Sequence, residues 1–252
     1  MEARRAQPAS GNAPVNKPSP DRSRVAEHLV LLCASALFNG LKEHECIEIA
    51  SCARARTFAR DEMLFAQGDP NRDLTLLLSG SVKLTQIGST GNEVLLWMSG
   101  QGDAVNISVP SSACSHTCSA RAVEQCRALV WEYSRLQALL NQYPQIRKNI
   151  NQILASRLGE LEERFREVAT EKAAKRLALV LLRLMKRVGK PATDGIQVSL
   201  SREELAQMTG TTLFTISRIL SKWAVQGFVL PRREAVVVKD RKMLEDAVED
   251  DD

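Results

Sequence analysis

Three residues with metal-binding side chains lie within five positions of one another in the segment Cys114-Ser-His116-Thr-Cys118. Thiolate sulfur and imidazole nitrogen suit transition metals, and either can serve as an axial ligand of haem iron. Three such residues in a row are a weak motif, so the alternative is a polar loop in which the cysteines are incidental. The segment predicts a metal or haem site at Cys114, His116 and Cys118. A polar loop that binds no metal remains the alternative.

A second set of polar side chains, in residues 211–222, is suited to a nucleic acid. Small hydroxyl groups are followed there by Arg218 and Lys222. Such groups bind phosphate oxygens and base edges, and an arginine can donate two hydrogen bonds to O6 and N7 of guanine. The predicted DNA-binding residues, together with a basic tip further along the chain, are Thr211, Thr212, Thr215, Ser217, Arg218, Lys222, Arg232 and Arg233.

Two short helices joined by a tight turn must position these side chains. Ser201 and Glu204 form a capping box, which starts the first helix. Gly210 supplies the positive φ that the turn requires. Apolar runs on either side of the basic tip predict a two-stranded wing over residues 227–238. The segment 201–238 is therefore predicted to be a winged helix-turn-helix rather than an ordinary helical hairpin with solvated charges.

Residues 144–169 are predicted to form one long amphipathic helix, because apolar residues recur there at three- and four-residue spacing. No equally long helix is predicted elsewhere, so the economical partner for the apolar stripe is a second copy in a twofold homodimer. The alternative is that the stripe packs on its own β domain. A break near Ala169-Thr170 predicts a hinge before the next helix, 171–187. The stripe consists of Ile146, Ile150, Leu154, Leu158, Leu161 and Phe165.

Short apolar runs punctuated by glycine fill the region from about residue 55 to 133. Many short strands with glycine turns indicate a barrel or sandwich, which could enclose a small ligand. Gly88 to Asn92 has residues that tolerate the positive φ of a hairpin tip. Strands are predicted at 63–65, 74–79, 81–87, 93–98 and 121–132, and helices before them at 24–38 and about 42–53.

The whole chain has 252 residues and a formal net charge of +4, which permits nucleic-acid binding without requiring it. The first residues carry no apolar core like that of a signal peptide, and no apolar run is long enough to span a bilayer. A cytoplasmic protein without membrane contact is therefore expected, and its six cysteines should be free thiols or ligands. No phosphate loop, nucleophile elbow or acid–base pair is evident, so the chain is not expected to be an enzyme.

The order and lengths of these parts resemble the cyclic AMP receptor protein and FNR (Crp/Fnr) superfamily over about residues 33–238. The segments 65–69, 76–83 and 100–103 look like that family's β-roll turns. The resemblance implies an α+β fold with a cyclic-nucleotide-binding-like β-roll (a double-stranded jelly roll), a long dimerisation helix and a C-terminal winged helix-turn-helix. The implied parts are a sensory domain 24–143, a dimerisation helix 144–169 and a DNA-binding domain 170–240. Composition predicts a disordered segment 1–23 before them and an acidic tail 241–252 after them.

The same resemblance implies a transcription regulator, either activator or repressor, that binds near-palindromic double-stranded DNA as a homodimer and has RNA polymerase as a partner. In such dimers the half-sites lie about one helical turn, ~34 Å, apart. By family position Thr215, Ser217 and Arg218 are the implied base contacts. The cyclic AMP receptor protein has an Arg-Glu pair where this chain has Leu213 and Phe214, so the target should differ. Leu213 is expected to touch a thymine methyl group, and Phe214 is interpreted as a core residue.

Cyclic-nucleotide binders of this family hold the ribose with a Gly-Glu turn and the phosphate with an Arg-Ser or Arg-Thr pair. The positions interpreted as equivalent are Gly102-Asp103 and His116-Thr117, and a mostly neutral histidine is a poor partner for a buried phosphate. The resemblance therefore implies no tight binding of cAMP. The predicted effector pocket consists of Gly102, Asp103, His116, Thr117 and Arg121.

The signal that the β-roll senses stays open at this point. Cys114 to His116 is similar to the Cys-x-His element of the carbon-monoxide-sensing haem members, with a one-residue shift. An FNR-type iron–sulfur cluster needs clustered N-terminal cysteines, and this chain has none before Cys33. A small effector, a redox signal, a gas signal and an effector-independent DNA-binding regulator are the hypotheses that remain.

Overall fold

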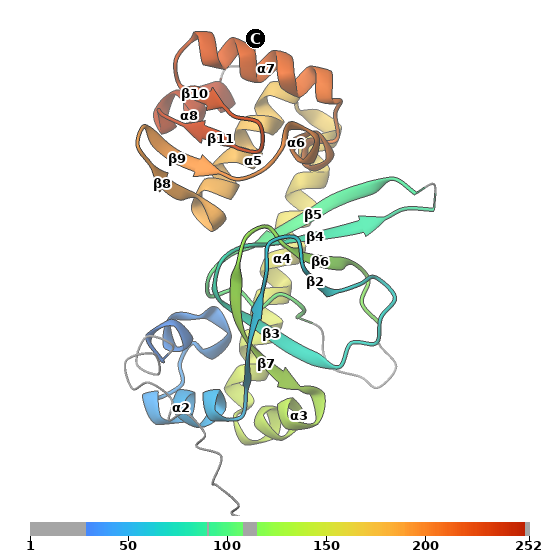
Figure 1. The fold of residues 1–252 in the computed structure, drawn as a ribbon, viewed down its shortest axis with the longest axis vertical. Helices are drawn as coiled ribbons and strands as arrows, with labels where there is room; N and C mark the ends of the chain where they lie inside the picture. Colours follow the sequence, from blue (N-terminus) through green and yellow to red (C-terminus); the bar gives the residue numbers. More distant parts are fainter. Residues whose placement is uncertain (1–28, 90, 108–114, 250–252) are drawn as a thin grey trace, which may run out of the picture.

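The computed structural model describes residues 29–89, 91–107 and 115–249. The predicted disordered segment 1–23 and the predicted metal ligand Cys114 lie outside this part of the chain. Figure 1 shows a β-roll domain at one end of the molecule and a smaller C-terminal domain at the other, with one long helix running between them. This order is the one that the resemblance implied.

The β-roll domain is built from two antiparallel sheets, with strand orders β1-β7-β3 and β2-β6-β4-β5. Apolar side chains of both sheets, among them Phe58, Leu77 and Val82, form a shared buried core. The strands are β1 (Arg54–Phe58), β2 (Met63–Phe65), β3 (Asp73–Ser79), β4 (Val82–Ile87), β5 (Glu93–Ser99), β6 (Ser119–Ala122) and β7 (Cys126–Glu132).

Two strand predictions in this domain were wrong. The predicted strand 121–132 is divided into β6 and β7, which belong to different sheets, so the chain must turn between them. Strand β1 was missed because four of its five residues are exposed, which leaves no apolar alternation to recognise.

Helices close the lower end of the β-roll in the view of Figure 1. Residues 29–34 are helical, and they are followed by η1 (Ala36–Phe38) and α2 (Glu43–Ser51) before the strands and α3 (Tyr133–Gln142) after them. Trp131 is buried between these helices and β3, and its indole Nε1 donates a hydrogen bond of 2.8 Å to the Ile49 carbonyl.

Helix α4 (Pro144–Thr170) is the predicted long helix, but its apolar stripe has two different environments. Ile146 and Ile150 are buried in the β-roll domain's own core, and Leu154 packs against the same cluster. The dimer-stripe prediction was therefore wrong for Ile146 and Ile150, for which the alternative of packing on the β domain holds. The second half of the stripe is exposed: Leu158, Leu161, Phe165 and Val168.

The chain leaves α4 through an extended residue, Glu171, and enters α5 (Ala173–Val188). The break therefore begins immediately after the predicted hinge at Ala169-Thr170, which is still helical. Two carboxylates of α4 reach across to α5. Glu167 accepts hydrogen bonds of 2.6 and 2.7 Å from Arg183, and Glu160 accepts bonds of 2.9 and 3.3 Å from Arg187.

The C-terminal domain contains the predicted two-helix unit, α6 (Arg202–Thr209) and α7 (Leu213–Val225), packed with α5 around one apolar core. The predicted wing is the β10–β11 hairpin, which belongs to a larger sheet of order β10-β11-β9-β8. The strands of this sheet are β8 (Lys190–Ala192), β9 (Gly195–Val198), β10 (Val229–Pro231) and β11 (Val236–Val238).

The acidic tail predicted from residue 241 is largely a structured element. Residues Arg241–Glu249 form helix α8, which packs against α5. Leu244 is fully buried there, and Ala247 and Val248 pack against the same core, so apolar side chains anchor a segment whose composition indicated only a charged tail. Within the described ranges, none of the helices is both long enough and apolar enough to cross a membrane.

Replacing Glu167 by glutamine should weaken the link between α4 and α5, because it leaves the half-buried Arg183 guanidinium without its counter-charge. Removing one partner of a buried ion pair costs about 3–5 kcal/mol, and the partial solvent access of Arg183 should reduce this to about 2–3 kcal/mol in the free energy of unfolding. Thermal and urea denaturation would measure the loss.

The matched control is Glu163→Gln on the same helix, where the carboxylate pairs with Arg166 in solvent. An exposed pair contributes at most about 1 kcal/mol, so this variant should be nearly neutral. Equal losses in the two variants would contradict the structural role given to Glu167.

Candidate nucleic-acid interface and sensory cavity

The turn between α6 and α7 has the geometry that the sequence predicts. The Ser201 hydroxyl accepts a hydrogen bond of 3.2 Å from the Glu204 amide, and the Glu204 carboxylate accepts one of 2.8 Å from the Ser201 amide. Gly210 ends α6 in the left-handed region, with φ of +60°. The capping box and the glycine turn are both confirmed, and they fix where α7 begins.

Thr212 caps the start of α7, and its hydroxyl accepts a hydrogen bond of 3.2 Å from the Thr215 amide. The inner face of the helix consists of Ile216, Leu220 and Trp223, which are buried in the core of the C-terminal domain. Because this face is fixed by apolar packing, the opposite face must point to solvent.

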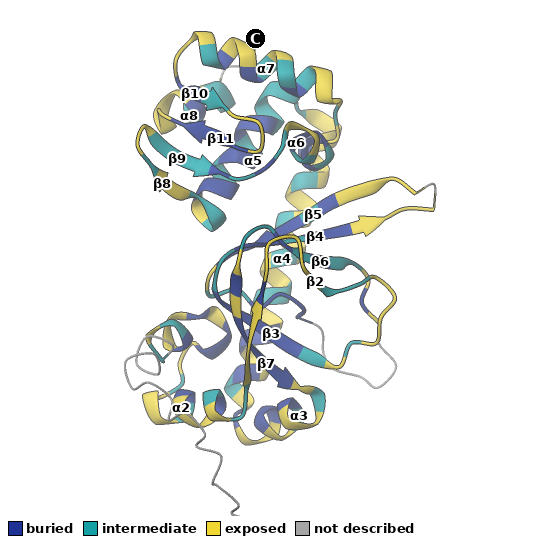
Figure 2. Cartoon of the chain, viewed as in Figure 1, coloured by how far each residue is buried: buried dark blue, intermediate teal, exposed yellow. Residues whose placement is uncertain are grey.

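The outward face of α7 carries most of the predicted DNA-binding residues. Thr212, Arg218 and Lys222 are exposed, and the other predicted positions, Thr211, Thr215 and Ser217, are half-buried. Figure 2 shows α7 along the end of the molecule that is farthest from the β-roll, with exposed residues on its outer side. The segment 213–225 contains no aspartate or glutamate, so the face is cationic and rich in hydroxyl groups.

One residue of this helix was assigned wrongly. Phe214, interpreted from the sequence as a core residue, is 85% exposed, whereas its neighbour Leu213 is 47% exposed. The residue type favoured burial, but the helical phase set by Ile216 and Leu220 places position 214 on the outer face.

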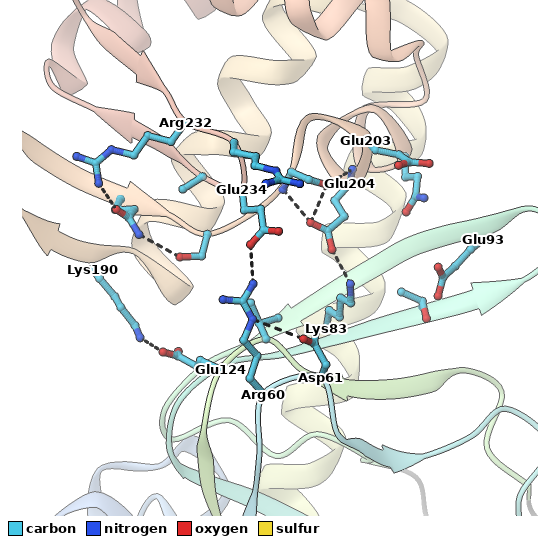
Figure 3. Close-up of a pocket in the computed structure, with 18 residues that line it drawn as sticks. Arg60, Asp61, Lys83, Glu93, Glu124, Lys190, Glu203, Glu204, Arg232 and Glu234 are labelled. Carbon is cyan, nitrogen blue, oxygen red and sulfur yellow. Dashed lines mark hydrogen bonds and ion pairs between the residues drawn. The ribbon is translucent and has the colours of Figure 1, made fainter.

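The two wing arginines lie elsewhere. Arg232 and Arg233 line a polar cleft of about 930 Å³ between the wing and the β-roll (Figure 3). Arg232 donates a hydrogen bond of 3.0 Å to Gln197, and the neighbouring Glu234 forms an ion pair of 2.6 Å with Arg60 of the β-roll domain. In this arrangement the wing tip faces the β-roll and not the side on which α7 is exposed.

Two more ion pairs cross this cleft: Lys83 with Glu204, at 2.6 Å, and Lys190 with Glu124 (Figure 3). Burial opposes ionisation of Glu204, but the hydrogen bonds from Lys83 and Ser201 outweigh it and lower the pKa of this carboxyl group. The carboxylate that caps α6 is therefore also an ionic contact to the β-roll domain.

The β-roll also contributes apolar side chains to the C-terminal domain. Leu95 and Met98 of β5 are buried in the same cluster as Leu181 and Ile216. Arg164 of α4 also joins the two domains, since it donates hydrogen bonds to the Leu96 carbonyl of β5 and the Met208 carbonyl of α6. The two domains thus share a core as well as ion pairs.

A second cavity, of about 300 Å³, lies between the turn at Gly102 and Asp103, η1, α4 and the last turn of α5. Its wall includes the indole of Trp97, with the guanidinium groups of Arg187 and Arg157 at 4.0 and 5.4 Å from the ring centre. Arg157 also donates a hydrogen bond of 2.6 Å to the Ala104 carbonyl. Burial raises the pKa of Asp103, whose carboxylate accepts a hydrogen bond from the Gly100 amide.

The predicted effector pocket is only partly assembled around this cavity, since its lining includes Gly102 and Asp103 but not His116, Thr117 or Arg121. His116 is stacked on Phe65, with ring centres 3.8 Å apart, and burial lowers the pKa of its imidazole. Thr117 is exposed. Arg121 donates a hydrogen bond of 2.7 Å to the Asp61 carbonyl.

The predicted metal or haem site stays a prediction, because Cys114 lies outside the described residues. Among the residues that are described, no three His, Cys, Asp or Glu side chains are grouped so that they could hold a metal ion. Burial raises the pKa of the Cys118 thiol, so a metal there would have to displace a firmly held proton. Cys46 is buried beside Cys33, and burial together with this neighbour raises its pKa to about 12.

Comparison with known proteins matches each domain to a family. Residues 55–143 match the cyclic nucleotide-binding domain, and residues 175–247 match the Crp-like helix-turn-helix domain. The CRP-like cAMP-activated global transcriptional regulator of Mycobacterium tuberculosis is 24% identical over 216 residues, which are 85% of this chain and 96% of that protein. The cyclic AMP receptor protein of Thermus thermophilus is 29% identical over 212 residues, which are 84% and 96% of the two chains.

The fold is also found in solved structures. FixK2 from Bradyrhizobium japonicum superimposes with a TM-score of 0.66 at 22% sequence identity, over 77% of this chain and 96% of that one. At this level of identity the likeness concerns the fold alone.

Proposed function

This chain belongs to the Crp/Fnr superfamily of transcription regulators, and from that premise we propose that it binds a near-palindromic site on duplex DNA as a homodimer under the control of a small effector. The predictions of a DNA-binding regulator and of a chain that is not an enzyme are confirmed by the comparisons. The dimer, the effector and a contact with RNA polymerase belong to the proposal.

The outward face of α7 is the observation that supports sequence-specific DNA binding. It combines Thr212, Arg218 and Lys222 with no acidic side chain, on a helix whose other face is locked by Ile216 and Leu220. A rigid helix with cations and hydroxyl groups along one side fits the major groove, where phosphates orient the protein and base edges select the sequence.

The exposed second half of the α4 stripe supports the homodimer. Leu158 and Phe165 are 58% and 78% exposed, and Leu161 and Val168 continue the same three- and four-residue spacing. Such a seam on a long helix is typical of a left-handed helix pair, and each of its four side chains keeps at least 45% of its surface exposed in this chain. A second copy of α4 would bury these side chains and place two α7 helices on one duplex.

The cavity beside Trp97 supports control by a small molecule. A ligand of fitting size there would contact the β-roll turn at Gly102, helix α4 through Arg157, and the C-terminal domain through Arg187. Because the three units meet at one place, binding there could favour one domain arrangement over another. The Mycobacterium tuberculosis relative is named for activation by cAMP; for this chain we propose a different effector, since His116 is stacked on Phe65 and is a poor phosphate ligand.

Replacing Arg218 by alanine should remove a base contact and weaken binding to the selected site by about 1–3 kcal/mol while relaxing preference at one base position in each half-site. Fluorescence anisotropy and footprinting on sites selected from a random duplex library would measure both effects. Arg135→Ala, an exposed arginine on α3 at the far end of the molecule, is the control and should bind as the unmodified protein does. An unchanged affinity and footprint for Arg218→Ala would overturn the assignment.

Replacing both Leu158 and Phe165 by aspartate should convert the dimer to a monomer, because paired helices would then bring four carboxylates into the apolar seam. Sedimentation velocity would report the change in mass, and thermal denaturation would verify that the monomer is folded. Glu162→Ala, an exposed change beside the seam on the same helix, should leave the dimer intact. A folded double variant that remains dimeric would contradict this interface.

Addition of cAMP should leave the affinity for the selected DNA unchanged, because His116, at the position interpreted as a phosphate ligand, does not line the cavity, is stacked on Phe65 and has a lowered pKa. Binding titrations with and without the nucleotide would test this, and isothermal calorimetry would detect binding that has no effect on DNA. A saturable increase in DNA affinity with cAMP would refute the proposed difference from the named relatives.

A further inference from the structure

The most exposed aromatic side chain of the C-terminal domain is Phe214, at the second position of α7. It is 85% exposed, while the large apolar residues Ile216, Leu220 and Trp223 of the same helix are buried. A phenyl ring in water forgoes the free energy that burial would supply. Phe214 lies beside a second exposed apolar residue, Leu213, at the N-terminal end of α7.

The neighbours of Phe214 identify the kind of partner. Residues three, four and seven positions along a helix share its face, which for Phe214 are Ser217, Arg218 and Ser221. This set is cationic and hydroxyl-bearing, and α7 contains no acidic residue. A surface of this charge is complementary to a polyanion, so the occupant of the face is the DNA duplex and not an apolar protein groove.

Within the major groove, one chemical group suits a phenyl ring. Base edges there present hydrogen-bond donors and acceptors, which phenylalanine cannot satisfy, and the 5-methyl group of thymine, which it can cover. The N-terminal residues of a recognition helix lie deepest in the groove. Phe214 occupies that first turn, immediately after the Thr212 cap.

We propose that Phe214 is a specificity-determining residue that packs on the 5-methyl group of a thymine in each half-site. This rests on the proposed function, because it assumes that α7 enters the major groove. Arg218 selects a neighbouring base by hydrogen bonds, while Phe214 selects thymine by exclusion of water from its methyl group.

Replacing thymine by deoxyuridine tests the contact directly, since it removes the methyl group and leaves every hydrogen-bonding atom in place. Sites are selected from a random duplex library with the full-length protein, and each thymine is then replaced in turn. For the unmodified protein, one position per half-site should lose affinity about fourfold, the value expected for one buried carbon group. Phe214→Ala should bind thymine and deoxyuridine duplexes equally at that position.

Two control variants separate this role from others. Val225→Ala, which removes a 90% exposed apolar side chain from the far end of α7, should keep the full thymine preference. Arg218→Ala should bind more weakly but keep the preference for thymine. Because Phe214 is exposed, thermal denaturation of Phe214→Ala should match that of the unmodified protein.

Each other outcome overturns the inference. A Phe214→Ala variant that still distinguishes thymine from deoxyuridine, or an unmodified protein that distinguishes them at no position, would show that Phe214 reads no methyl group. A change in oligomeric state without a change in thymine preference would assign the ring to a protein contact instead. Failure to select any duplex would overturn the proposed function itself, which distinguishes that failure from the others.

Discussion

The paired carboxylates and guanidinium groups between α4 and α5 are the interaction on which the relative placement of the two domains depends. Glu167 with Arg183 and Glu160 with Arg187 each form two hydrogen bonds. A planar two-bond pair restricts rotation as well as distance. Removing charges from water offsets most of their attraction, so such pairs contribute less to net stability than to the choice of one arrangement. Because α7 shares its core with α5, these pairs also set the direction in which the DNA-reading face points.

The apolar contact made by β5 ties the sensory domain to this same arrangement. Leu95 and Met98 lie in the core of the C-terminal domain, and the ion pairs of Lys83 with Glu204 and of Arg60 with Glu234 also join the two domains. The wing arginines face the cleft that these residues line. A change in the β-roll near Trp97 would therefore act on the C-terminal domain through direct packing, and a wing that binds DNA would first have to leave the β-roll. In this structure the outer face of α7 is exposed to solvent, whereas the wing tip contacts the β-roll through the ion pair of Glu234 with Arg60.

Much of the DNA-reading unit could be predicted from the sequence because its signals are local. A capping box and a glycine with positive φ each depend on residues within a few positions, and both are where the sequence predicts them. Predictions about which apolar side chains are exposed were less successful, because burial depends on which other element packs against each helix. Ile146 and Ile150 continue the α4 stripe in sequence but are covered by the β-roll, and Leu244 anchors α8 within a segment whose composition is acidic. Spacing along a helix reveals that a face is apolar, but not what covers it.

By itself, the sequence determined the order of the parts, the two-helix unit with its turn and the cationic, hydroxyl-rich character of α7, because short-range hydrogen bonding and periodicity decide these. Only the tertiary structure decided that Gly102 and Asp103 face one cavity while His116 stacks on Phe65, that the wing arginines turn toward the β-roll and that Phe214 lies outside the core. These outcomes depend on contacts between residues far apart in the chain. Packing of whole elements, and not the preference of any single residue, selects among the arrangements that local rules permit.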